Sequence, residues 1–277
     1  MSKVSQYIRF ALLEEGYHYD HTVHDRGHFE ILIFRYGEGH LNVDTNRFEI
    51  KRNLFIFLSP GQKRKWSHHT KNIQGYTIQF ERGFLEDFFA DSLFTFRLQF
   101  FYNDFKLPIF MAENQRLFSF KHDIFEEMKN ELLHDQNDST HLLRSILYYV
   151  LIKLNRFYCA YHGLEATTQG NTVAFQFKRA IEQHLKTKKK VQDYADLLGI
   201  SRVSLNKVCK QKFNQSAIDL INNRLIREIK NELIYSNDTI SQIAYGLNFS
   251  EPNNLIRFFK KNVGVTPKAF RIQHLSK

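Results

Sequence analysis

The sequence predicts an α+β protein of two domains, in which a strand-rich first half is followed by an all-α second half. Residues 1–110 contain short runs of Phe, Ile, Leu and Val separated by turn residues, whereas apolar residues recur at helical spacing after residue 115. The 277 residues are enough for two domains of ordinary size, and 43% of them are hydrophobic, which is ample for packed cores.

The charge divides the chain at the same place. Residues 171–277 hold 19 Lys and Arg against 8 Asp and Glu, a net charge of +11, while residues 1–170 hold 20 against 21, a net charge of −1. A neutral half joined to a basic half is typical of a nucleic-acid-binding module attached to another domain. A basic helical domain without such a partner would have the same charge, so the charge alone leaves that alternative open.

The first half contains several short strand-like segments at regular spacing. Gly37, Gly39 and the Ser59-Pro60-Gly61 sequence mark turns between them. Many short strands with such turns indicate a barrel or a double-sheet sandwich. The expected strands are His28–Tyr36, Leu41–Val43, Phe48–Ile50, Leu54–Leu58 and Tyr76–Phe80.

A pocket for an organic effector is one interpretation of this half. Period-two alternation places His28, Glu30, Leu32, Phe34 and Tyr36 on one face of a strand. If that face points inward, His28 and Glu30 are costly to bury without a partner, which suggests a ligand. Trp66 and Tyr76 could add flat walls with a polar group. A filled barrel with the same polar groups at its rim is the alternative.

Residues 115–160 predict two amphipathic helices separated by the polar sequence HDQNDST. After them, Gly163–Asn171 is small and polar, as expected of a flexible linker. Thr172–Lys186 begins the second half with a helix whose apolar stripe is Phe175, Ala180, Ile181 and Leu185. The stripes of the two earlier helices are Leu117, Phe118, Ile124, Phe125, Met128, Leu132 and Leu133, and Leu142, Leu143, Ile146, Leu147, Val150, Leu151 and Leu154.

The second half contains two helix-turn-helix patterns. In the first, a short apolar-faced helix from Val191 is followed by Gly199 at the turn and by Ser201 as the N-cap of a second helix. In the second, Thr239 caps a helix with Ile240, Ile243, Ala244 and Leu247 on one face, Asn248 occupies the turn, and Ser250 is the expected N-cap of the next helix, with Pro252 in its first turn.

A third amphipathic stretch connects the two patterns. Leu205 and Leu255 occupy equivalent places, 50 residues apart. The intervening stretch Ser216–Ser236 spans roughly 31 Å as a helix. Successive major-groove faces on one side of B-DNA are about 34 Å apart. The connector therefore has the right length to place the helices 201–213 and 251–263 on one side of a duplex.

The segment Val191–Arg271 resembles the DNA-binding domain of AraC/XylS-type bacterial transcription regulators, which contains two helix-turn-helix motifs. The sequence IAYGLNFSEPNNLIRFFKKNVGVTPKAFR aligns without a gap with the family pattern IA…GF…P..F.R.FK…G.TP..FR. Asn248 and Asn214 stand where the family has Gly, which is the substitution that a left-handed turn tolerates best. Asn254, Leu255 and Cys209 replace the usual Tyr, Phe and Phe.

The strand order of residues 20–110 resembles the cupin-like ligand-binding domain that often precedes this DNA-binding domain. Metal-binding cupins use two His and a Glu from a first motif, which His24, His28 and Glu30 could mimic, and a further His after the Pro-Gly turn. Here the residues after Pro60-Gly61 are Gln62, Lys63, Arg64, Lys65 and Trp66. A protonated lysine near the fourth place repels a cation and cannot coordinate it. His68 and His69 are out of register. We expect neither a metal nor another cofactor.

The resemblance also implies the residues that contact DNA. The family's base-contacting positions map onto Val203, Asn206, Lys207, Asn253, Ile256 and Arg257, and Asn, Lys, Arg, Val and Ile can all contact base edges in the major groove. The full set expected at the DNA is Arg202, Val203, Ser204, Asn206, Lys207, Lys210, Asn253, Asn254, Ile256, Arg257, Lys260 and Lys261. Phosphate contacts are expected from Lys188–Lys190, Lys210, Lys212, Lys260, Lys261 and Arg271.

Together these observations predict a transcription regulator and no enzyme. Residues 1–160 are expected to bind an effector and to form a homodimer through residues 115–160, and residues 172–277 to bind promoter DNA. The resemblance further implies an activator that contacts RNA polymerase. A metal-dependent cupin enzyme and a ligand-independent regulator are the alternatives.

Several absences in the sequence are consistent with this interpretation. The sequence contains no Gly-x-Ser-x-Gly, phosphate-binding Gly-rich loop, CxxC or HExxH motif. It also lacks an apolar run long enough to span a membrane, and its N-terminus does not resemble a signal peptide. Cys159 and Cys209 lie on apolar stripes, which suggests buried free thiols in a reducing cytoplasm.

Overall fold

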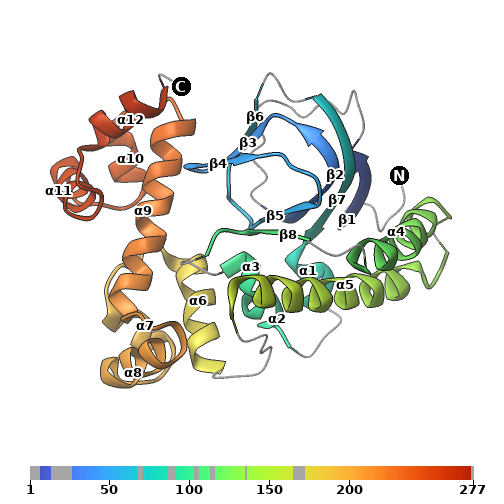
Figure 1. The fold of residues 1–277 in the computed structure, drawn as a ribbon. Coiled ribbons are helices and arrows are strands. Elements are labelled where there is room, and N and C mark those ends of the chain that lie inside the picture. The colour runs from blue at the N-terminus through green and yellow to red at the C-terminus, as the bar shows by residue number, and fades with distance from the viewer. Residues whose placement is uncertain are drawn as a thin grey trace. The chain divides into compact units, whose positions relative to one another are not determined.

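The computed structural model describes residues 7–13, 27–67, 71–86, 91–102, 106–112, 116–134, 136–164 and 172–275. It divides into two compact units, Met1–Gln169 and Gly170–Lys277. The first unit contains the strands and the second unit is helical (Figure 1). Among the described residues, no helix is long and apolar enough to cross a bilayer.

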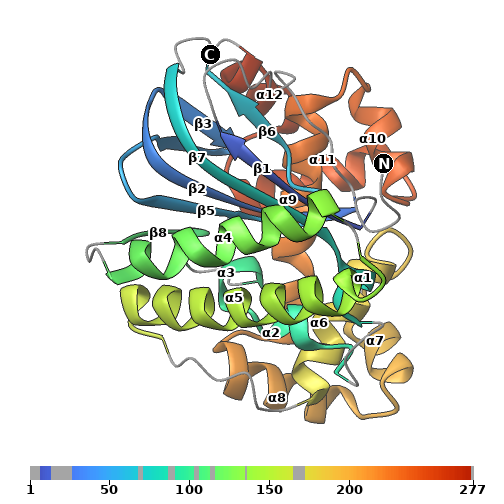
Figure 2. The ribbon, with the colours of Figure 1, turned by 90° about the vertical axis from the view of Figure 1, so that its right-hand side faces the viewer.

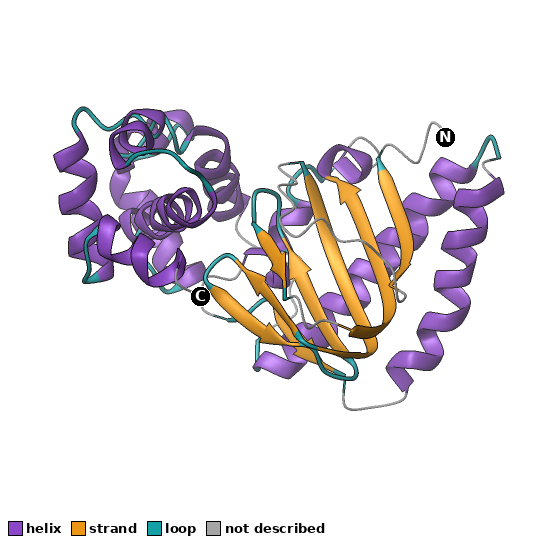
Figure 3. Cartoon of the chain, turned by 90° about the horizontal axis from the view of Figure 1, so that it is seen from above, coloured by secondary structure: helices purple, strands orange, loops and turns teal. Residues whose placement is uncertain are grey.

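Two antiparallel sheets form the first unit. The larger has the order β1-β7-β2-β5-β8 and the smaller the order β4-β3-β6. The strands of both sheets are orange in Figure 3. Apolar side chains from both sheets pack into one core, which includes Leu32, Phe34, Leu41, Ile56 and Trp66. The strands are β1 (Ile8–Leu13), β2 (His28–Glu38), β3 (His40–Val43), β4 (Asn46–Glu49), β5 (Leu54–Leu58), β6 (Arg64–Trp66), β7 (Lys71–Glu81) and β8 (Ile109–Met111).

Helices cover the other face of the larger sheet. Phe29 of β2 contacts Phe101 at a ring-centroid distance of 4.5 Å, and Phe57 of β5 stacks on Phe100 at 4.1 Å. Because both faces of β2 and β5 are covered, these strands are apolar on both sides, as in a buried sheet. The covering helices are α1 (Arg82–Glu86), α2 (Phe94–Arg97), α3 (Gln99–Tyr102), α4 (Arg116–His134) and α5 (Ser139–His162), with α4 and α5 side by side in Figure 2.

The structure corrects the strand assignment in three respects. The expected strands are present, but β7 begins five residues earlier, at Lys71, and β4 is Asn46–Glu49. The strands β1, β6 and β8 were not predicted, because each is short and its pattern is weak. The described parts of residues 82–102 contain three short helices and no strand, since the apolar face that they cover selects helices over the high strand propensity of their aromatic residues.

A β-bulge breaks the predicted alternation on β2. Phe34 pairs with Gly75, but Tyr36 pairs with Gln74, so one extra residue, Arg35, lies between the two pairs. Such an insertion reverses the side on which the following side chain points. Tyr36 is therefore 48% exposed and does not share the face of Leu32 and Phe34, contrary to the expectation.

The predicted hairpin is present as α4 and α5, with Leu143, Leu147, Val150, Leu151 and Leu154 buried on α5. Two members of the expected stripes are instead exposed, Leu142 at 39% and Leu133 at 69%. The side chains of Leu117 and Phe118, like most of the expected linker Gly163–Asn171, lie outside the described residues.

The second unit contains the two helix-turn-helix motifs around one core. Buried residues of both motifs, among them Tyr194, Leu205, Leu255 and Phe259, belong to a single cluster together with Leu225 of the connecting helix α9. The helices are α6 (Thr172–His184), α7 (Val191–Leu197), α8 (Arg202–Phe213), α9 (Ala217–Tyr235), α10 (Ile240–Gly246), α11 (Pro252–Val263) and α12 (Pro267–Leu275).

The helix termini confirm most of the predicted capping residues. Ser201 and Thr239 accept hydrogen bonds from the third residue of their helices, and Gly199 and Asn248 adopt left-handed φ angles of 64° and 54°. Ser216, which was not predicted as a cap, does the same at the start of α9. The predicted cap at Ser250 is wrong, because the N-cap of α11 is Glu251.

Candidate nucleic-acid interface and effector cleft

The two candidate recognition helices, α8 and α11, each bury one side and expose the other. Leu205 and Cys209 of α8 and Leu255 and Phe259 of α11 lie in the shared core. Burial raises the pKa of the Cys209 thiol to about 12, so this cysteine remains a neutral, apolar core residue. The exposed side chains are Arg202, Val203, Ser204, Lys207 and Lys210 on α8, and Asn253, Arg257, Lys260 and Lys261 on α11, while Asn206, Asn254 and Ile256 are half-buried.

Val203 is the most exposed large apolar side chain of this surface, at 79%. An apolar side chain in that position lies at the N-terminal end of α8, which is the part of a recognition helix that contacts base edges. A valine there can contact thymine methyl groups. Its exposure therefore fits the predicted contact.

Asn206 has a role that the sequence did not reveal. Its Oδ1 accepts a hydrogen bond from the backbone N–H of Ala217 at 2.9 Å, and its Nδ2 donates to the carbonyl of Arg202 at 3.1 Å. Ala217 is the first residue of α9 and is fully buried. The side chain thus joins α8 to the start of α9 and satisfies a backbone donor at a helix N-terminus. Both polar atoms of the Asn206 side chain therefore already have hydrogen-bond partners within the protein in the absence of DNA.

The polar residues at the start of α11 form a short chain of hydrogen bonds. Arg257 Nη2 donates to Oδ1 of Asn254 at 2.7 Å, and Asn254 Nδ2 donates to Oγ of Ser250 at 2.7 Å. The half-buried Asn254 therefore orients the exposed guanidinium of Arg257. A pre-oriented guanidinium retains further N–H donors for a guanine edge.

The basic residues expected at phosphates divide into two groups. Lys210, Lys260 and Lys261 are exposed in the last turns of α8 and α11. In contrast, Arg271 Nε donates to the carbonyl of Leu233 at 2.9 Å, and Lys212 lies 5.5 Å from the Phe175 ring centroid. These two contacts attach α12 to α9 and α8 to α6, so both side chains have structural partners that the sequence spacing could not show.

Lys189 also differs from its neighbours. Its Nζ donates to the carbonyl of Asn248 at 2.9 Å and lies 5.0 Å from the centroid of the Phe249 ring. Burial lowers the pKa of this ammonium group. Lys188 is half-buried and Lys190 is exposed at the N-cap of α7.

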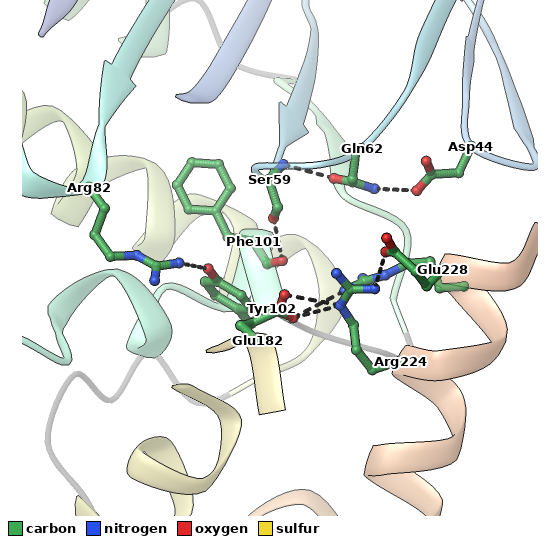
Figure 4. A network of polar contacts seen from close by, with 10 residues as sticks. Asp44, Ser59, Gln62, Arg82, Phe101, Tyr102, Glu182, Arg224 and Glu228 are labelled. Carbon is green, nitrogen blue, oxygen red and sulfur yellow. Dashed lines mark hydrogen bonds and ion pairs between the residues drawn. The ribbon is translucent and has the colours of Figure 1, made fainter. Parts of the chain in front are cut away.

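A half-buried ion-pair cluster fixes α6 on α9. Arg224 Nε donates to both carboxylate oxygens of Glu182, at 2.9 and 3.0 Å, and its Nη1 contacts Glu228 at 2.8 Å (Figure 4). Burial acts to lower the pKa of the Arg224 guanidinium, but the two carboxylates outweigh burial and raise it above the ordinary value. The charge is therefore permanent, and the pairing positions the helix that precedes the first motif.

In the first unit, the predicted effector residue Glu30 has several partners within the protein. Its carboxylate is 1% exposed and accepts hydrogen bonds from Thr77 Oγ1 at 3.0 Å and Gln79 Nε2 at 2.8 Å. It also pairs with Arg64 Nη1 at 2.8 Å. Because Arg64 lies on β6 and Glu30 on β2, the pair joins the two sheets. These partners offset part of the cost of burying Glu30, but among the described residues its Oε2 accepts no hydrogen bond.

The other predicted effector residues do not gather around Glu30. His28 is half-buried, with its Nε2 3.4 Å from Glu81. Trp66 lies in the core between the sheets, 6.0 Å from the Phe34 ring. Tyr76 points to the helical side, where it stacks on Phe10 at 5.5 Å and contacts Phe125 of α4 at 5.0 Å. A role of these four residues in binding one effector stays a prediction.

A cleft of about 630 Å³ lies instead at the bulge of β2. The guanidinium of Arg35 lies 5.2 Å from the Tyr76 ring centroid at this cleft, and within the described part of the chain it has no acidic partner. Gly75 permits the close pairing here, since a Cβ at this position would lie 2.0 Å from the Ile33 carbonyl oxygen. The lining residues are Leu12, Leu13, Arg35, Tyr36, Asn72, Ile73, Gln74, Gly75 and Tyr76.

The sequence placed Tyr76 in a pocket with His28, Glu30 and Trp66, and it did not indicate this cleft. A glycine inside a strand pattern, at Gly75, is the signal that could have indicated a bulge or a close approach. No group of three His, Cys, Asp or Glu that could hold a metal occurs among the described residues. His24, His68 and His69 lie outside that part of the chain.

Comparison with protein families gives two matches that together include most of the chain. Residues 8–151 match the model of the AraC-like ligand binding domain, and residues 194–273 match a helix-turn-helix domain. No curated protein sequence matches the chain significantly.

Solved structures of similar proteins include ToxT from Vibrio cholerae, with 15% identity over 96% of this chain and 98% of that one and a TM-score of 0.46. The DNA-binding domain of AdpA, in complex with a target DNA, is 19% identical over 39% of this chain and 96% of that one, with a TM-score of 0.35. The xylose-binding transcription activator xylR is 23% identical over 39% of this chain, with a TM-score of 0.34. The match spans only 28% of the length of that activator.

Proposed function

The chain belongs to the AraC family of DNA-binding transcription regulators with a ligand-binding domain, and we propose that it activates transcription under the control of a small-molecule effector. At its target promoters, α8 and α11 enter two successive major-groove segments. The observation that supports this most directly is the pair of exposed polar helix faces at the two ends of α9. That helix has 19 residues and spans about 28 Å, close to the roughly 34 Å between groove segments.

The contacts assigned to DNA follow from exposure and chemistry. Arg257 and Lys207 can donate to guanine, Asn253 can pair with adenine, and Val203 can contact a thymine methyl group. Lys210, Lys260 and Lys261 are suited to phosphates because their ammonium groups are exposed at the rims of the two helices. Arg202, Ser204, Asn254 and Ile256 complete the surface.

Footprinting tests this part of the proposal. Full-length protein is used to select a binding site from random DNA, and the site is then probed for protection. For each bound protomer, we expect two protected major-groove segments about one helical turn apart. Protection of a single segment would contradict the use of both helices.

The effector is assigned to the cleft at Arg35. A guanidinium next to the Tyr76 ring, with the polar side chains of Asn72 and Gln74 and the apolar side chains of Leu12 and Ile73, suits an organic molecule that carries an anionic group.

A variant pair tests the effector site. Arg35→Met should abolish the thermal shift given by any carboxylate-bearing metabolite that stabilises the wild-type protein, because the methionine cannot pair with the anion. Arg47→Met is the matched control, since Arg47 is exposed on β4 and is not among the lining residues of the cleft. An unchanged shift in Arg35→Met would place the effector elsewhere. If no metabolite shifts the wild type, a ligand-independent regulator is favoured.

The remaining partners follow from the same assignment. We assign homodimerisation to α4 and α5, whose exposed apolar side chains include Leu133, Leu142, Tyr148 and Tyr149. Contact with RNA polymerase and a cytoplasmic location are parts of the proposed activator role, which includes no catalytic step.

A further inference from the structure

Lys189 forms a direct contact between the two helix-turn-helix motifs. It lies in the connection between α6 and α7 of the first motif, whereas its partners Asn248 and Phe249 form the turn between α10 and α11 of the second. The Nζ atom donates to the Asn248 carbonyl at 2.9 Å and stands 5.0 Å from the Phe249 ring centroid. These residues are 59 positions apart in the sequence.

Both ends of this contact are held firmly by their own motif. On the first side, the hydroxyl of the buried Tyr194 donates to the carbonyl of Lys188 at 2.8 Å, and the N–H of Lys188 bonds to His184 at 2.8 Å. On the second side, the backbone N–H of Asn248 bonds to the carbonyl of Tyr245 and that of Phe249 to the carbonyl of Ala244, both at 2.9 Å. A contact between two rigid segments restrains the motifs that carry them.

The helix α9 alone does not define how the two recognition helices are oriented. The connecting helix sets the distance between the motifs and the shared apolar core packs them together, and a direct polar attachment between the motifs adds resistance to bending and rotation about α9. The half-buried ammonium of Lys189 supplies such an attachment through a hydrogen bond and a cation–π contact, both of which are stronger away from bulk water.

We propose that Lys189 is a positioning residue that holds the two recognition helices at the mutual angle required to occupy both DNA segments at once. This inference rests on the proposed two-segment mode of DNA binding. Simultaneous binding by two linked elements depends on how often both are correctly placed, so the restraint raises affinity for a correctly spaced site and lowers tolerance of other spacings.

The prediction for Lys189 differs from that for a phosphate contact. A lysine that contacts phosphate contributes to every complex that includes its helix, and its loss reduces the salt dependence by about one charge. A lysine that positions the helices contributes only when both segments are bound. The two roles can therefore be separated by the DNA used.

The experiment measures binding of the full chain to a DNA site selected from random sequence by the wild-type protein. A second DNA has one of the two segments scrambled, and a third carries two additional base pairs between the segments. The Lys189→Met variant keeps the apolar stem of the side chain but loses the ammonium. Lys186→Met is the matched control, because Lys186 is an exposed lysine in the same connection.

We expect Lys189→Met to bind the two-segment DNA about tenfold more weakly, which corresponds to about 1.4 kcal/mol. Its affinity for the scrambled DNA should equal that of the wild type, and its salt dependence should not change. The two additional base pairs of the third DNA should reduce the affinity of the variant less than they reduce the affinity of the wild type. Lys189→Arg should restore most of the two-segment affinity, since a guanidinium can make both contacts.

Two results would overturn the inference. An equal loss on the two-segment and scrambled DNA, with a smaller salt dependence, would make Lys189 a phosphate contact. Equal affinity of Lys189→Met and wild type on all three DNAs would remove any role in binding. If the wild-type protein selects no DNA sequence, the proposed function fails instead, and the two failures are thus distinguishable.

Discussion

The two helix-turn-helix motifs share one plan but use their polar residues differently. In the first motif, the amide of Asn206 braces α9 and the most exposed apolar residue is Val203. In the second motif, the equivalent position of Asn206 is the half-buried Ile256, and an amide–guanidinium pair of Asn254 and Arg257 lies at the surface. Equivalent helices in a duplicated domain can therefore divide bracing and recognition between them.

The turns of the two motifs also differ, by one residue. Gly199 and Asn248, the left-handed turn residues, are 49 positions apart, while the C-caps Asn214 and Gly264 and the N-caps Ser201 and Glu251 are 50 apart. The additional residue is Ser250, which accepts a hydrogen bond from Asn254. The insertion explains why Ser250 is not the N-cap, and it provides the second motif with the hydroxyl that orients Asn254.

The largest expected effect tests whether the motifs share one core. Leu205→Ala and Leu255→Ala should each lower the free energy of unfolding by ~2–5 kcal/mol, because both leucines are fully buried in the same cluster. Chemical denaturation followed by far-UV circular dichroism measures the loss. The sole tryptophan, Trp66, lies in the first unit and reports on that unit separately. Two helical transitions in addition to the one that coincides with the Trp66 signal, in either variant, would show two independent cores.

A second pair of variants tests the division between bracing and recognition. Asn206→Ala leaves the buried N–H of Ala217 without its acceptor, so it should cost ~1–3 kcal/mol of stability and leave base preference unchanged. Arg257→Ala should change stability by less than ~0.5 kcal/mol but reduce discrimination at one base pair by ~1–3 kcal/mol. Denaturation and binding to a panel of single-base variants of the selected site measure the two quantities. A change of base preference in Asn206→Ala together with a loss of stability in Arg257→Ala would refute the division between bracing and recognition.

The smallest effect concerns the C-caps. Asn214 and Gly264 both adopt left-handed φ angles, of 54° and 86°, and end α8 and α11. Gly264→Ala should cost about 1 kcal/mol, since a Cβ is disfavoured in this conformation. Gly264→Asn should cost roughly half as much, and Asn214→Gly should be nearly neutral. Thermal unfolding midpoints check the order, and a larger cost for Gly264→Asn than for Gly264→Ala would contradict it.

The sequence predicted the elements of the second unit closely because their signals are local. Apolar residues three and four positions apart define the buried stripes of α7–α11, and Ser201, Ser216 and Thr239 cap their helices within three residues. In the first unit, β1, β6 and β8 were missed because three- to six-residue strands depend on the partner strand more than on their own pattern.

The candidate site was less predictable where a side chain has distant partners. Spacing alone places Asn206, Lys189 and Arg271 on polar surfaces, yet their partners lie 11, 59 and 38 residues away. Glu30 was suspected of needing a ligand because Thr77 and Arg64 are not adjacent to it in sequence. A long polar side chain can reach several backbone groups, so its role depends on which of them the fold brings near.

By itself, the sequence determined the division into a strand-rich and a helical half, the family, and the exposed faces of α8 and α11, because periodicity, capping and turn residues act over a few positions. Only the tertiary structure decided that Glu30 pairs with Arg64, that a bulge at Arg35 opens a cleft beside Tyr76, and that Lys189 joins the two motifs. These features depend on contacts between segments far apart in the chain, whose distances are set by the packing of the whole unit.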